Sequence, residues 1–155
     1  MKAKKQDPKD RLLAVLELQH VSTIELPEQE VHALQDQWRR VFASRVKKLT
    51  GKRVHLGFDW HAFSYSMVHA LKGEDARQAY RQESCRAFYV LPHMDEGLGY
   101  KCQANMLPVL EGKYIDAYVC PLSFGWTMVY THESECGPYF TRAEWAERQT
   151  KPALR

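Results

Sequence analysis

The chain has 155 residues, of which 45% are hydrophobic and 26% are charged, the balance of a globular protein with one core. A chain of this length needs no disulfide or metal staple, and no apolar run approaches the roughly 18 residues of a membrane helix. The formal net charge of +3 is too small to indicate nucleic acid binding by itself.

The first residues, MKAKKQDPKD, are polar and rich in lysine, so we expect residues 1–10 to be flexible. They lack the apolar core of a signal peptide, which predicts a cytoplasmic protein. Leucine and valine dominate residues 11–19 and suit a short helix, and VSTIEL at 21–26 suits a strand. Because no linker or repeat interrupts the chain, we predict a single domain over residues 1–155.

The clearest helical pattern starts at Pro27, which with Glu28 and Glu30 is typical of a helix N-terminus. Apolar residues then recur every three or four positions as far as Leu49, which predicts one long amphipathic helix. Residues 54–60 alternate apolar and polar side chains and predict a strand. Residues 74–82 form a second helical pattern.

The second half of the sequence is typical of a sheet. Four apolar, β-branched and aromatic runs are separated by turn residues, at 85–93, 97–104, 114–122 and 126–133. HMDEG predicts an antiparallel hairpin between the first two runs, and residues 123–125 form a tight turn between the last two. The segment between the middle pair has room for one helical turn. The fold class is therefore α+β, with N-terminal helices packed on a mostly antiparallel sheet formed by the second half.

The end of the sequence contains turn and capping signals. Gly137-Pro138-Tyr139-Phe140 reads as a turn whose two aromatic rings plug the sheet edge. Thr141 and Glu144 have the spacing of a capping box, which predicts a short C-terminal helix that starts there.

Three patches carry a resemblance to a known family. They are WHAFSY at 60–65, AFYVLPH at 87–93 together with FGWTMVYTHE at 124–133, and CGPYF at 136–140. With these patches the chain resembles DUF4275, a family of small uncharacterised bacterial proteins. The resemblance covers about the last two-thirds of the chain and implies a small α+β fold, and it supplies no activity, cofactor or catalytic residue.

The most informative segment is WTMVYTHESECGPYF at 126–140. His132 and Cys136 have the spacing of two zinc ligands on a helix, but the strand before them and Gly137-Pro138 after them argue against a helix, so we predict no metal there. A strand that ends in a polar loop is a common place for recognition groups. The predicted partner-binding residues are Asp95, Glu96, Trp126, His132, Glu133, Glu135 and Tyr139.

We expect a small cytoplasmic protein-binding domain that uses no cofactor, and in its sharpest form an immunity or antitoxin-like protein that occludes a bacterial toxin. Aromatic anchors and acidic loops suit a basic protein partner. One alternative is an enzyme or metal-binding protein that uses His61, His132 and Cys136. Another is a nucleic-acid binder that uses Arg39–Arg53, which holds seven positive charges and no acid.

Overall fold

The computed structural model describes residues 7–43, 69–92, 97–112, 115–132 and 137–148. These residues form helices at both ends of the chain and a sheet between them, which confirms the predicted α+β fold. The helices are α1 (Pro8–Leu18), α2 (Glu28–Phe42), α5 (Glu74–Arg81) and α6 (Ala143–Arg148). The strands are β1 (Ser22–Glu25), β2 (Leu71–Lys72), β3 (Ala87–Pro92), β4 (Tyr100–Gln103), β5 (Ala117–Pro121), β6 (Trp126–Tyr130) and β7 (Tyr139–Arg142).

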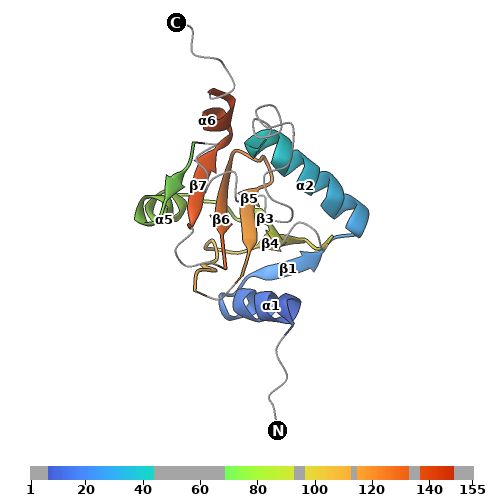
Figure 1. The fold of residues 1–155 in the computed structure, drawn as a ribbon. Helices are drawn as coiled ribbons and strands as arrows, with labels where there is room; N and C mark the ends of the chain where they lie inside the picture. Colours follow the sequence, from blue (N-terminus) through green and yellow to red (C-terminus); the bar gives the residue numbers. More distant parts are fainter. Residues whose placement is uncertain (1–6, 44–68, 93–96, 113–114, 133–136, 149–155) are drawn as a thin grey trace, which may run out of the picture.

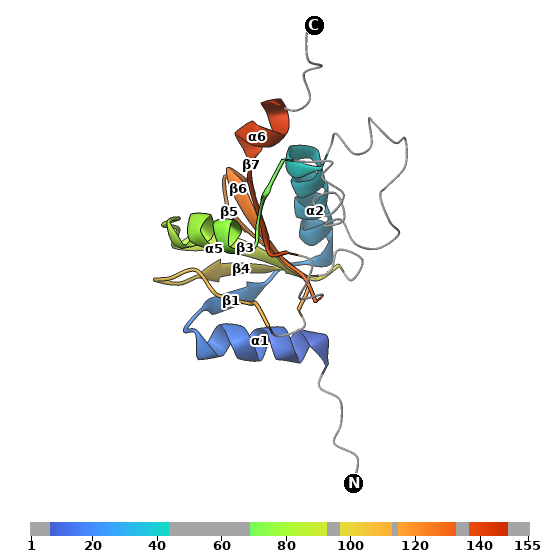
Figure 2. The same cartoon turned by 60° about the vertical axis from the view of Figure 1, so that its left-hand side comes forward.

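The seven strands make one antiparallel sheet in the order β1-β4-β3-β5-β6-β7-β2 (Figure 1). The four strands predicted from the second half form its centre as two hairpins, β3–β4 and β5–β6. The predicted N-terminal strand is also present and joins the sheet as the edge strand β1. Helices cover both faces, and α5 and α2 lie on opposite sides of the sheet (Figure 2).

The face toward α1 and α5, which we call the α5 face, carries the larger apolar cluster. Leu12 and Leu16 of α1 and Tyr80 of α5 are buried there against strand side chains such as Phe88 and Met128. Burial of this kind supplies most of the stability of a small domain, about 25 cal/mol for each Å² of apolar surface removed from water.

The opposite face, which we call the α2 face, is built around Trp38. Its indole stacks edge-on against Tyr118 with ring centroids 4.6 Å apart. Its Nε1–H donates to the Thr127 hydroxyl (2.9 Å), which in turn donates to the carbonyl of Val119 (3.1 Å). A buried indole N–H needs such an acceptor, so this chain of bonds fixes the angle of α2 on the sheet.

Some predicted boundaries were wrong. Helix α2 ends at Phe42, before Leu49, with Ala43 as its C-cap. Residues 105–112 contain bends and a turn and no helix. The two-residue strand β2 was not predicted. The strand predicted at 54–60 and residues 1–6 of the segment expected to be flexible lie outside the described residues. Residues 8–10 of that segment form the first turn of α1, with Asp7 as its N-cap, so the expectation of flexibility was wrong there.

The predicted turn at the end of the chain is a strand. Tyr139 and Phe140 open β7 and pair with Val129 and Met128 of β6. The Thr141 hydroxyl donates to the carbonyl of His69 (2.6 Å), so Thr141 is a residue of the sheet and does not form the predicted capping box. Pairing with β6 therefore overrides the local turn signal. The bond between Gly137 and Pro138 is cis.

Candidate functional site at one end of the sheet

A polar pair lies at one end of the central strands, where β5 begins and β6 ends. The register joins Ala117 to Tyr130, so the residues just outside the strands, Asp116 and Thr131, are neighbours across the hairpin. His132 follows directly. The fold therefore brings Asp116 and His132 together although they are 16 positions apart in the chain.

The Asp116 carboxylate holds His132 by three contacts. The backbone N–H of His132 donates to Oδ1 (2.9 Å), and the ring Nδ1 lies 2.9 Å from Oδ1 and 2.8 Å from Oδ2. A carboxylate only accepts hydrogen bonds, so Nδ1 carries the hydrogen.

The two side chains differ in exposure. Asp116 is 14% exposed and His132 is 36% exposed, so the carboxylate lies inside and the imidazole reaches the surface. A ring whose position is fixed by a buried carboxylate loses little conformational freedom when it binds something. The pair can therefore serve as a preorganised contact for a partner or as an oriented acid–base group.

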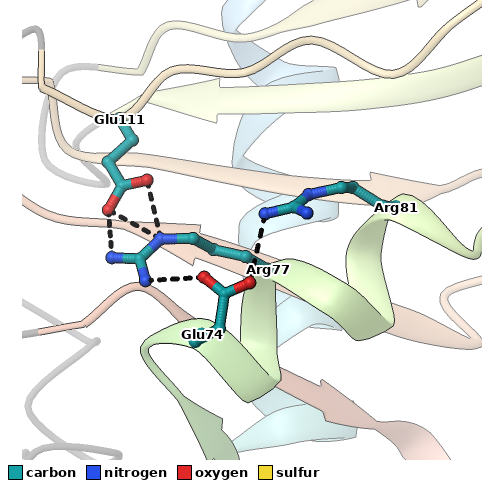
Figure 3. A network of polar contacts seen from close by, with 4 residues as sticks. All are labelled: Glu74, Arg77, Arg81 and Glu111. Atoms are coloured by element: carbon teal, nitrogen blue, oxygen red, sulfur yellow. Dashed lines mark hydrogen bonds and ion pairs between the residues drawn. The ribbon is translucent and has the colours of Figure 1, made fainter.

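The segment that leads to Asp116 is anchored to α5. The Tyr80 hydroxyl donates to the carbonyl of Pro108 (2.6 Å), and the guanidinium of Arg77 binds the carboxylate of Glu111 through Nε and Nη2 (Figure 3). Arg77 also contacts Glu74 (3.3 Å), which lies 3.5 Å from Arg81. These contacts connect Pro108 and Glu111, which precede Asp116 in the chain, with a helix.

Electrostatics reinforce this anchor. The hydrogen bond from Arg77 lowers the pKa of the Glu111 carboxyl, so the ion pair is complete at neutral pH. Burial raises the pKa of the Tyr80 hydroxyl well above its ordinary value, so Tyr80 remains a donor toward Pro108.

Only part of the predicted partner-binding set is described. His132 lies at the sheet end with its ring accessible. Trp126 and Tyr139 are buried, the first among the side chains of the α5 face and the second on the α2 face. Their rings pack inside the domain, so they do not form an exposed contact surface for a partner in this structure. The acidic residues of the set lie outside the described residues: Asp95, Glu96, Glu133 and Glu135.

Two strands that precede acidic segments in the sequence end close to Asp116 and His132. Strand β3 ends at Pro92, opposite Ala117 of β5, and β6 ends at Tyr130, also opposite Ala117. Strands β3 and β6 therefore both end at the end of the sheet where Asp116 and His132 lie. Acidic residues follow both strands in the sequence.

The alternative sites are described in part. His61 and Cys136 lie outside the described residues, as do residues 44–53 of the basic segment. Arg39, at the end of α2, lies 3.5 Å from Asp36. The described cysteines are held inward: burial raises the pKa of Cys102 to about 12, and the Cys85 thiol donates to the carbonyl of Ala87 (2.9 Å). A thiol in that state is a poor nucleophile.

Asp116 is the residue of the pair that the sequence prediction missed. Counting outward from the predicted turn at 123–125 places Asp116 opposite His132, one residue away from the observed register, in which Ala117 pairs with Tyr130 and Asp116 lies beside Thr131. The predicted turn therefore contained the information that brings Asp116 close to His132. Using it requires pairing the two strands residue by residue, beyond recognising each strand separately.

Comparison with known proteins gives one match. A family model described as "Domain of unknown function (DUF4275)" matches residues 11–140. Searches of curated proteins and of solved structures found no significant match. Among the described residues, no helix has both the length and the apolar character of a membrane span, and no three His, Cys, Asp or Glu side chains are placed to hold a metal ion.

Proposed function

Because the chain belongs to the DUF4275 family, whose description assigns no activity, we propose a function from the site: a cytoplasmic protein-binding domain whose contact surface is the sheet end around Asp116 and His132. In its sharpest form, the domain is an immunity or antitoxin-like protein that binds a bacterial toxin and occludes it. The observation that carries the proposal is the imidazole of His132, presented at the surface and oriented by a nearly buried carboxylate.

The physical argument rests on preorganisation. A binding residue whose rotamer is already fixed gives more net affinity, because little side-chain entropy is lost when the complex forms. Hot spots cluster around such rigid groups, and charge around them steers association. The acids that follow β3 and β6 in the sequence supply that charge and favour a basic partner surface.

The test is co-expression with the products of the adjacent genes. The wild-type chain is expected to copurify with one of them and to restore growth if that product is toxic. His132→Ala should lose the rescue, whereas His32→Ala, a matched exposed histidine on α2, should retain it. Rescue that is equal in both variants, or no binding to any adjacent product, would overturn this form of the proposal.

The same geometry favours a second candidate, an acid–base or metal-binding role for His132. A carboxylate bound to Nδ1 is the arrangement that orients histidines in many catalytic and metal sites. Elemental analysis of protein purified without a histidine tag tests the metal form, and protein without stoichiometric metal would remove it. Turnover of a panel of chromogenic esters tests the acid–base form, which fails if wild type and His132→Ala give the same rate.

A further inference from the structure

We draw no further inference here: the strongest candidate, the apolar surface patch where Leu18 at the end of α1 and Val109 in the segment after β4 are exposed and the Gln19 side chain joins the two segments, carries nothing because nothing in the structure shows what covers it.

Discussion

At each end of the central strands a basic side chain is paired with a carboxylate, and the two pairs have different surroundings. At one end Asp116 holds His132, whose ring is 36% exposed. At the other, Arg142 binds Glu83 (2.6 Å), and its guanidinium carbon lies 5.1 Å from the Phe140 ring centroid and 5.7 Å from that of Trp145. The first pair presents a group to the surface, and the second binds strand, helix and aromatic rings together.

The difference separates a residue that suits recognition from one that suits packing. A cation that lies over aromatic rings and meets a carboxylate from another element contributes to stability. A histidine that is oriented from behind by a carboxylate and reaches the surface can act on something outside the domain. Variants at the His132 end should therefore change partner affinity, and variants at the Arg142 end should change the free energy of unfolding.

The largest effect is expected on partner affinity at the His132 end. His132→Ala should weaken binding of the adjacent gene product by about thirtyfold, roughly 2 kcal/mol, as for a central contact of an interface. Its free energy of unfolding should change by less than about 1 kcal/mol, because the ring is partly exposed. Calorimetric titration and urea denaturation measure the two quantities. A loss of stability with unchanged affinity would assign His132 to packing instead.

The next effect is a loss of stability at the opposite end. Arg142→Met keeps the aliphatic stem but removes the charge, and it should lower the free energy of unfolding by about 1 to 2 kcal/mol. Arg86→Met, at an exposed position, is the control and should change it by less than about 0.5 kcal/mol. Partner affinity should stay at the wild-type value. If Arg142→Met lowers partner affinity without loss of stability, Arg142 belongs to the recognition surface and the assignment of this end to packing is wrong.

The smallest effect concerns the anchor behind Asp116. The pKa of Glu111 is lower in the folded chain than in the unfolded one. The contribution of Glu111 to the free energy of unfolding is therefore present above the unfolded pKa and is lost as pH falls through the folded pKa. Glu111→Gln should therefore narrow the stability difference between about pH 6 and about pH 3. Urea midpoints at both pH values measure it. The proposal that Arg77 and Glu111 hold this segment fails if the variant loses as much stability in acid as the wild type.

The central strands were predictable because their signals are local and agree with one another. Apolar and β-branched runs separated by turn residues identified β3, β4, β5 and β6, and the tight turn before Trp126 linked the last two. Helix α5 was also predicted almost to the residue, because acids at its start and one apolar face are sufficient local signals.

The failures come from contacts between distant residues. Strand β7 follows a Gly-Pro signal that predicts a turn, and its pairing with β6 and β2 makes it a strand. Asp116 has no motif of its own, and its role depends on the register of the β5–β6 hairpin. The burial of Trp126 likewise follows from which face of the sheet the helices cover. The burial of Tyr139 and Phe140 agrees with the prediction that their rings plug the sheet.

The most direct test of the proposed function is an NMR titration of the histidine rings with the adjacent gene product. Long-range ¹H–¹⁵N spectra separate the two ring nitrogens, and the free protein should show His132 with hydrogen on Nδ1. On addition of the partner, the His132 signals should shift or broaden, while the indole signal of Trp145 at the other end should stay in place. A complex that moves the Trp145 signal and leaves His132 unchanged would contradict the account.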